Sequence, residues 1–423
     1  MKRPLTVLIA PSGFKESLGA REVTEAIAEG VRAAMPGARI LRAPMADGGE
    51  GFTDALVEAT GGRIQRVRVT GPVGLPVDGF FGWLGAPGPR TAVIEMAAAA
   101  GLRLVPRDRR NPMETTSFGV GELMRAALDA GAERILLGCG DSGVNDGGAG
   151  MAQALGARLL DRDGGELPPG GGALQRLHRI DLTDLDPRLA RTGLDAAVNW
   201  HNALLGERGV ARVFGPQKGA TPAQVDALEA GLARYAAAIA DATGRRVAGQ
   251  PGAGASGGLG AGFAGLLGGT LHPRFEVVMR YLDLDRLLDA ADLVLTAEGS
   301  LDEQTPHGKV PAEVARRAKQ RGLPVIALAG TLGRGAGINH AHGIDAFASI
   351  LKRPCTLDEA IAHTGRWLAR AAEDSLRMVA VGLALHAPGA CTVRRVHGWR
   401  PDAPLPGLGV RRRYLPPSAH SSR

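Results

Sequence analysis

Short apolar strands alternate with amphipathic helices at both ends of the chain, and this alternation is the feature that most limits its fold. The same pattern opens the chain and returns after about residue 290. Such alternation is typical of α/β proteins with parallel sheets. The elements predicted in these two regions are strands over 5–10, 40–43, 292–296, 324–329 and 346–350, and helices over 17–35, 311–321 and 357–385.

The middle of the chain is less regular and rich in glycine. A chain of 423 residues exceeds the roughly 250–300 residues that one core usually spans, so two domains are expected. We predict a two-domain α/β fold in which 1–72 and 270–385 form a discontinuous, Rossmann-like parallel-sheet domain. A second glycine-rich α/β domain, 73–269, is inserted, and the active site is expected in the interdomain cleft. Residues 386–423 lack periodicity and are predicted to form a disordered basic tail.

Composition excludes several classes of function. The net charge is +7, but the segment 386–423 carries seven arginines and one acid, so the rest of the chain is close to neutral. With aromatics at only 4%, nucleic-acid binding is not expected. The apolar runs are too short to span a membrane or to form a signal-peptide core. Three widely spaced cysteines suit a reducing cytoplasm. We therefore predict a cytoplasmic protein with a small-molecule substrate, and the sequence leaves a homo-oligomer open.

Lysine is rare in this chain, and three lysines lie in glycine-bearing loops. Only six of the 50 basic residues are lysine. Lysine offers a compact, mobile charge where arginine offers a planar fork. Lys15, Lys218 and Lys309 are therefore candidates for binding anionic groups, although each could instead be an ordinary surface residue of its loop.

A glycine-rich loop over 138–150 follows a predicted strand and precedes a helix. Glycines let backbone amides approach an anion, and a helix N-terminus adds positive charge. Gly138, Gly140 and Gly143 also match a dinucleotide-binding fingerprint, with Asp161 at the spacing expected for a ribose contact. The alternative function is therefore an NAD-dependent oxidoreductase acting on a small hydroxy acid. Asp141 and Asp146 disfavour this alternative, because a carboxylate repels pyrophosphate unless Mg²⁺ lies between them. A purely structural turn is the third interpretation.

Acidic residues follow two other predicted strands. Asp47 stands in the loop 45–51, while Glu298 and Asp302 stand in the loop that leads to Lys309. Open α/β sheets place ligands at the carboxyl ends of their strands. Phosphoryl transfer requires positive charge on the phosphates, a metal held by oxygen ligands and a group that orients the attacking hydroxyl. Lysine loops and acidic loops together therefore favour an ATP-dependent kinase. The P-loop pattern is absent, since Val310 follows Lys309.

Several motifs in chain order resemble the bacterial glycerate kinase family over about residues 4–380. They are Ala10-Pro-Ser-Gly-Phe-Lys15-Glu-Ser17, Pro44-Met-Ala-Asp47-Gly-Gly-Glu50-Gly51, Thr115-Thr-Ser-Phe-Gly-Val-Gly-Glu122, Asn145-Asp-Gly-Gly-Ala-Gly150, Phe214-Gly-Pro-Gln-Lys218-Gly-Ala220, Glu298-Gly-Ser-Leu-Asp302-Glu-Gln-Thr305 and His307-Gly-Lys309. The resemblance implies phosphorylation of D-glycerate with ATP and Mg²⁺, usually to 2-phosphoglycerate. Three positions depart from the family pattern, namely Asp141, Asn199 and Ser300.

The expected site residues fall into three groups. Asp47 is expected to be the base, with Lys15 and Lys218 as catalytic cations. Substrate or ATP binding is expected from Ser142, Asn145, Gly147, Gly148 and Lys309. Metal binding is expected from Asp146, Glu298 and Asp302.

Overall fold

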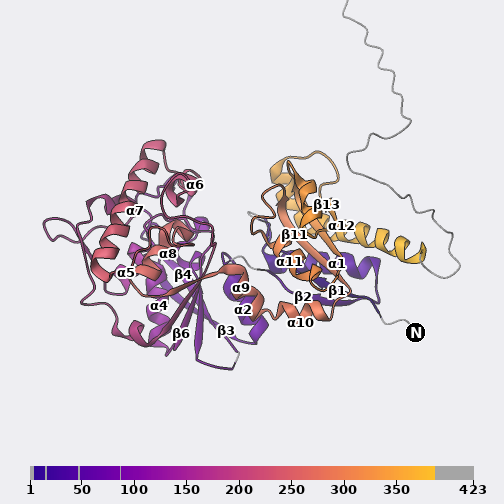
Figure 1. Ribbon diagram of the computed structural model, residues 1–423, viewed down its shortest axis with the longest axis horizontal. Coiled ribbons are helices and arrows are strands. Elements are labelled where there is room, and N and C mark those ends of the chain that lie inside the picture. Colours follow the sequence, from indigo (N-terminus) through magenta and orange to yellow (C-terminus); the bar gives the residue numbers. More distant parts are fainter. Residues whose placement is uncertain (1–3, 15–16, 46–47, 86, 386–423) are drawn as a thin grey trace, which may run out of the picture. The chain divides into compact units, whose positions relative to one another are not determined.

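The computed structural model describes residues 4–14, 17–45, 48–85 and 87–385, and all structural statements concern these ranges (Figure 1). Its strands are β1 (Thr6–Ile9), β2 (Arg39–Arg42), β3 (Arg63–Thr70), β4 (Pro76–Trp83), β5 (Thr91–Glu95), β6 (Arg134–Gly138), β7 (Arg158–Leu160), β8 (Arg179–Asp181), β9 (Gly193–Val198), β10 (Thr270–Pro273), β11 (Leu293–Leu301), β12 (Val325–Leu332) and β13 (Ala346–Ser349).

Its α-helices are α1 (Ala20–Ala34), α2 (Phe52–Thr60), α3 (Ala97–Ala100), α4 (Phe118–Asp129), α5 (Ala149–Ala154), α6 (Val210–Phe214), α7 (Pro222–Thr243), α8 (Ala255–Gly265), α9 (Arg274–Tyr281), α10 (Leu284–Asp289), α11 (Val310–Lys319) and α12 (Leu357–Leu385). The short 3₁₀ helices used below are η3 (Gly171–Arg176) and η5 (Pro216–Lys218). No helix of the described ranges is long and apolar enough to cross a membrane.

The first sheet joins strands from both ends of the chain. Its order is β13-β12-β11-β1-β2 and every pairing is parallel. All four residues of β1 are buried, as expected for an inner strand of a sheet covered on both faces. The strand order reverses between β1 and β11, and open α/β sheets bind ligands outside the carboxyl ends of the strands at such a point. The segments that follow these two strands contain Lys15 and Asp302, respectively.

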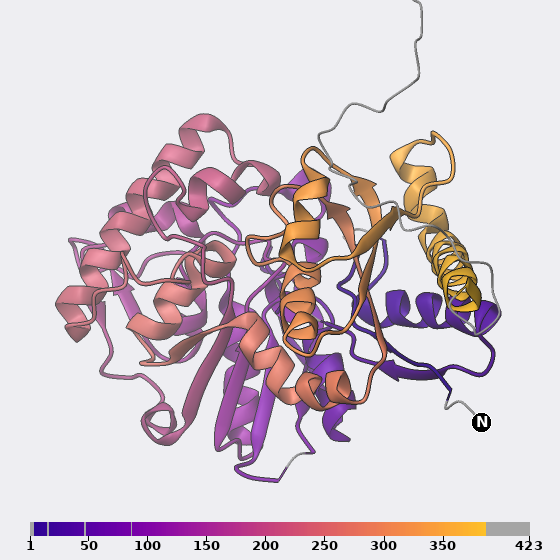
Figure 2. The ribbon, with the colours of Figure 1, turned by 45° about the vertical axis from the view of Figure 1, so that its right-hand side comes forward.

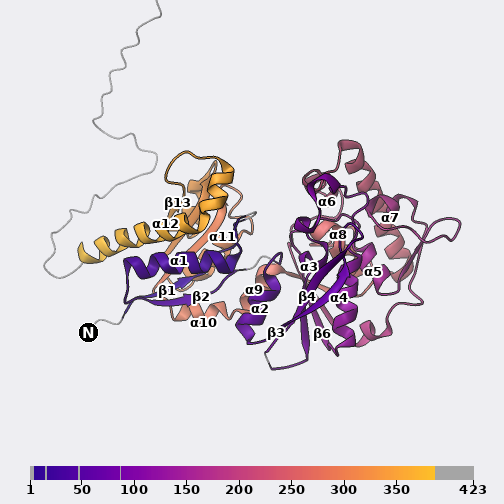
Figure 3. The ribbon, with the colours of Figure 1, turned by 180° about the vertical axis from the view of Figure 1, so that it is seen from behind.

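Helices α1 and α12 lie side by side next to this sheet (Figures 2 and 3). Their closest approach is at Gly30, where a Cβ would stand 2.1 Å from the carbonyl oxygen of Ala369 and 2.8 Å from the Cβ of Ala372. Only glycine fits this crossing without displacing α12. The close packing of α1 against α12 therefore depends on glycine at position 30.

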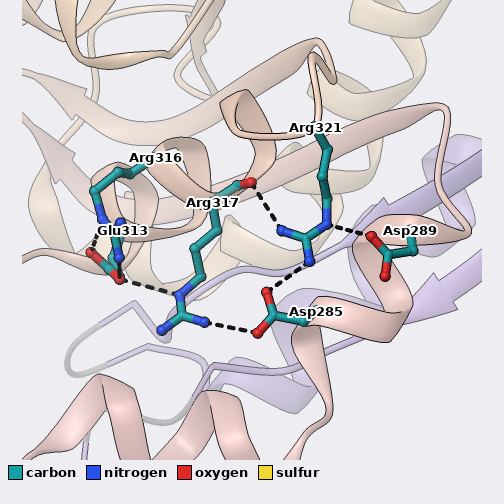
Figure 4. A network of polar contacts seen from close by, with 6 residues as sticks. All are labelled: Asp285, Asp289, Glu313, Arg316, Arg317 and Arg321. Atoms are coloured by element: carbon teal, nitrogen blue, oxygen red, sulfur yellow. Dashed lines mark hydrogen bonds and ion pairs between the residues drawn. The ribbon is translucent and has the colours of Figure 1, made fainter.

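A surface network of ion pairs ties α10 to α11 (Figure 4). Arg317 Nη1 lies 3.1 Å from Asp285 Oδ2, and Arg321 Nε lies 2.6 Å from Asp289 Oδ1. Glu313 accepts from Arg317 within α11 and closes the network on that side. Exposed pairs contribute about 0.2–1 kcal/mol each, so the network orients α10 more than it stabilises the fold.

The second sheet is mixed, with the order β10-β9-β6-β5-β4-β3. Strands β10, β9, β6 and β5 are parallel, whereas β4 runs antiparallel to both of its neighbours. Successive residues of β5 face opposite sides: Ile94 joins the core beneath α4, and Val93 packs in the cluster that contains Phe52 of α2. Because both faces are covered there, β5 and β6 are largely apolar, whereas β3 mixes apolar with charged or polar residues and is only partly buried.

The sequence limits of the two sheets differ from the predicted limits of the two domains. Strand β3, over 63–70, pairs with β4, and β10, over 270–273, pairs with β9. Both therefore belong to the second sheet, although the prediction assigned 1–72 and 270–385 to the first domain. The division into two domains stays a prediction, and the expected tail lies outside the described residues. Leu174 of η3 is buried beside α7.

Candidate active site

The loop between β6 and α5 makes a tight turn at Gly147 and Gly148. Both have positive φ, 68° and 79°. A Cβ on Gly147 would stand 2.7 Å from the ring of Tyr235, so glycine is required for contact as well as for conformation. The Gly147 amide donates to the carbonyl of Gly257 at 3.0 Å, and the Gly148 amide donates to Asp146 Oδ1 at 3.2 Å. The structure therefore does not support the expectation that these amides hold phosphate, because carbonyl and carboxylate groups of the protein already occupy them.

Asp146 is fully buried and holds the loop together. Its Oδ2 accepts from the amide and hydroxyl of Ser117, at 2.7 and 2.8 Å, and from the Gly150 amide at 3.2 Å. With the bond from Gly148 to Oδ1, the carboxylate accepts four hydrogen bonds, three of them at Oδ2. Burial raises the pKa of Asp146, and these hydrogen bonds oppose the rise. The geometry gives Asp146 a structural role at the start of α4 and α5.

Lys218 of η5 reaches this loop from a distant part of the chain. Its Nζ donates to Ser142 Oγ at 2.9 Å and to the Val144 carbonyl at 2.6 Å, and the residue is 2% exposed. Burial lowers the pKa of Lys218 to about 7, and the nearby charge of Asp146 partly opposes this. An ammonium has three N–H donors, so one is left for a ligand. The structure thus brings together the predicted pair Lys218 and Ser142.

Asn145 lies between Ser142 and Asp146 in the sequence and is also fully buried. Neither Oδ1 nor Nδ2 of its amide has a hydrogen-bond partner among the described residues. Buried side-chain amides are nearly always paired in folded proteins, so an unpaired one indicates a contact that a ligand or water completes.

A second group of predicted residues lies at the end of β11. The Nζ of Lys309 contacts both carboxylate oxygens of Asp302, at 3.1 and 3.2 Å, and also donates to the Ser300 carbonyl. Burial favours a higher pKa for Asp302, but hydrogen bonds from Lys309 and the Gln304 amide outweigh it, so the net pKa is lowered. Glu298 lies four residues earlier in β11, opposite Ala329 of β12.

Two of the three residues expected to hold Mg²⁺, Asp146 and Asp302, are engaged by other groups of the protein. The oxygens of Asp146 accept four protein hydrogen bonds, and those of Asp302 are engaged by Lys309 and Ser300. In the described ranges, no group of three or more His, Cys, Asp or Glu side chains could hold a metal ion. Magnesium needs carboxylate oxygens with free lone pairs. We therefore derive no catalytic step through a protein-held metal.

The loop that leads into α2 packs against the residues after β6. A Cβ on Gly49 would stand 2.1 Å from Asp141 Oδ2, and the Glu50 amide donates to that same oxygen at 3.1 Å. Glu95, 3% exposed, accepts from the Thr53 amide at 3.0 Å and fixes the start of α2. Burial raises the pKa of Glu95 to about 7. This loop carries Asp47, which lies outside the described residues, as does Lys15.

Comparison with known proteins identifies the family of this chain. A family model described as the glycerate kinase family matches residues 7–380. The chain belongs to the glycerate kinase family. The predicted family and its enzymatic class are thereby confirmed.

Curated and solved relatives cover nearly the whole chain. A glycerate kinase from Bacillus subtilis (strain 168) is 48% identical over 370 residues, which are 88% of this chain and 96% of the relative. A glycerate 2-kinase from Escherichia coli (strain K12) is 45% identical, with 90% and 99% covered. A solved structure, "putative glycerate kinase 2 from Salmonella typhimurium LT2", is 46% identical with a TM-score of 0.75 and covers 90% of this chain and 100% of that one. This match confirms the predicted α/β fold class.

The geometry of the loop after β6 does not support the oxidoreductase alternative. A dinucleotide fingerprint must open a helix directly. Here α5 begins only at Ala149, after the turn at Gly147 and Gly148. Asp161 accepts from the amides of Asp163 and Gly165 in the turn after β7, a strand of a separate two-stranded sheet. It serves the turn, not a ribose.

Sequence analysis overlooked four buried polar residues of this site, namely Ser117, Glu95, Tyr235 and Ser256. Ser117 could have been found as a helix N-cap, since it directly precedes the apolar period of α4. Glu95 ends an apolar strand, which is an unusual place for an acid. Tyr235 occupies a core position of an amphipathic helix, and Ser256 lies within a glycine run, so neither carries a local signal of function.

Proposed function

We propose that this chain phosphorylates D-glycerate, with ATP as the phosphoryl donor and 2-phosphoglycerate as the product. The observation that carries the proposal is the buried ammonium of Lys218 beside the Ser142 hydroxyl. A partly desolvated cation attracts a carboxylate or phosphate more strongly than an exposed one does. The names of the relatives, glycerate kinase and glycerate 2-kinase, support this substrate. The cytoplasmic location and a homo-oligomer stay predictions.

Substrate binding is assigned to the loop that follows β6. The third N–H of Lys218 donates to the carboxylate of glycerate, and the ammonium charge neutralises that carboxylate. Ser142 accepts from Lys218, so its own hydroxyl proton is available for a second substrate oxygen. Lys309, which directly precedes α11 and contacts Ser300 of β11, supplies positive charge for the nucleotide phosphates.

Transfer itself requires little beyond orientation of the accepting hydroxyl. We propose Asp47 as the residue that orients this hydroxyl and receives its proton late in the transfer. The next residue, Gly48, packs closely on the backbone of Cys139, at the start of the loop that carries Ser142. Asp47→Asn keeps the shape but loses the basicity, so kcat should fall about 10²–10⁴-fold while the KM for ATP changes little.

The test is an assay of ADP release by the purified full-length protein with ATP, MgCl₂ and a panel of short hydroxy acids. Glycerate should give the highest turnover, and phosphorus–proton coupling in the product should place the phosphate on the 2-oxygen. A parallel reaction with NAD⁺ tests the oxidoreductase alternative. Background ADP release together with reduction of NAD⁺ would overturn the proposal.

A further inference from the structure

Three buried polar side chains without partners surround the same glycine turn. They are Asn145, Tyr235 and Ser256, which are 0%, 0% and 8% exposed. Within the described part of the chain, neither amide atom of Asn145, nor the hydroxyl of Tyr235 or Ser256, has a hydrogen-bond partner. Four such atoms in one place are a concentration that folded proteins normally avoid, because an unpaired buried polar group is costly.

The elements that carry these side chains are in direct contact. A Cβ on Gly257 would stand 2.0 Å from the Val144 carbonyl oxygen and 2.9 Å from Asn145 Cα. The Val144 carbonyl is also an acceptor for Lys218 Nζ, at 2.6 Å. The start of α8, the loop after β6 and the buried ammonium therefore meet at one carbonyl group.

Ser256 adopts a backbone conformation that serine rarely takes. Its φ and ψ are 54° and 51°, and the two residues after it, Gly257 and Gly258, are also left-handed. Glycine would adopt this conformation without strain, and the chain places glycine at the next two positions. A strained serine retained at a buried, unpaired position indicates that its hydroxyl has a use.

We propose that Ser256 and Asn145 bind the substrate hydroxyl that is not phosphorylated, and that Ser256 thereby selects glycerate over hydroxy acids that lack this group. The inference rests on the proposed function. A hydroxyl both donates and accepts, so it pairs with Oδ1 of Asn145 as acceptor and with the hydroxyl of Ser256 as donor. Lys218 lies beside them to hold the carboxylate. A substrate without this hydroxyl leaves both groups unpaired, which is how a polar site rejects an analogue.

The experiment measures binding of D-glycerate and D-lactate to the full-length protein by calorimetry in the absence of ATP. D-lactate keeps the carboxylate and the 2-hydroxyl but lacks the 3-hydroxyl. Two variants remove the Ser256 hydroxyl in different ways: Ser256→Gly also relieves the backbone strain, whereas Ser256→Ala retains it. Both should weaken glycerate binding roughly three- to tenfold, the value of one hydrogen bond, and leave lactate binding unchanged.

Thermal melting separates this effect from a folding defect. Ser256→Gly should melt at or above the wild-type temperature, because strain is removed, so weaker glycerate binding by this variant cannot come from unfolding. Unchanged glycerate binding in both variants would overturn the proposal, as would a parallel loss for lactate. Turnover of glycerate by the wild-type protein tests the proposed function separately, so the two can fail independently.

Discussion

The Nζ of Lys218 donates a 2.9 Å hydrogen bond to the Oγ of Ser142, a residue 76 positions earlier in the chain. The direction of this bond decides what Ser142 can do. Because its oxygen is already an acceptor, its proton is directed elsewhere. Lysine and serine therefore present two donors to the same neighbourhood, which suits an anionic ligand.

Replacement of Lys218 by methionine should abolish most of the activity without unfolding the protein. Methionine has a similar volume but no charge, so kcat/KM for glycerate should fall about 10²–10³-fold, as when one partner of a buried charged contact is removed. Lys352→Met is the matched control, because Lys352 is exposed and pairs with Asp374 at the surface. Equal kinetics for the two variants would exclude Lys218 from the site. Circular dichroism checks the fold of each.

The pH dependence of glycerate use follows from the lowered pKa of Lys218, about 7 against an ordinary 10.5. The free enzyme carries the ammonium below this value and loses it above. The profile of kcat/KM against pH, which reports the free enzyme, should therefore be flat below about pH 7 and decline above it. In Lys218→Arg, the decline should disappear from this range because arginine stays charged, although its fork should impair turnover. A decline that persists unchanged in this variant would belong to another group.

Asp146→Asn distinguishes a structural carboxylate from a metal ligand. An amide presents two N–H groups to donors of Ser117, Gly148 and Gly150, so the variant should lose about 2–4 kcal/mol of unfolding free energy. Denaturant titration measures this loss. Asp161→Asn, in an exposed turn, is the control and should be nearly neutral. Unchanged stability combined with a higher magnesium requirement would assign Asp146 to the metal instead.

Gly30→Ala should destabilise the contact between α1 and α12. The added Cβ would stand 2.1 Å from the Ala369 carbonyl, so α12 must shift, at a cost of about 1–3 kcal/mol. Gly37→Ala adds the same atom where nothing lies within 4 Å and should be tolerated. A comparison of their melting temperatures checks the packing, and equal values would show that α12 does not rest on α1 in this way.

Local signals predicted the elements well, because they depend on a few neighbouring residues. Gly61 ends α2 with φ 67°, as expected for a helix C-cap, and the Thr221 side chain caps α7 by accepting from the Gln224 amide. The sequence could predict only that Lys218 and Ser142 belong to the same site. It could not predict the hydrogen bond between them, since no local pattern encodes a contact over 76 residues.

The role of the glycine loop shows where prediction from sequence fails. The backbone amides of these glycines were expected to be free to bind phosphate. In the structure they donate hydrogen bonds to Gly257 and Asp146, which tertiary structure brings next to them. The strain at Ser256 has the same origin, because it is visible only in the backbone dihedral angles.

The parallel pairing of β1 with β11 constrains how the chain can be synthesised and folded. Val7 lies opposite Leu293, so β1, an inner strand of the first sheet, lacks one of its two neighbours until the ribosome has made almost three hundred residues. At about 5–20 residues per second, the buried face of β1 waits roughly 15–60 s for that neighbour. The second sheet draws its strands from an uninterrupted stretch of chain, 63–273, and can assemble during this time. Nascent chains should therefore pass through a stage in which β1 and β2 are a ready target for chaperones, whereas the glycine turn is already built.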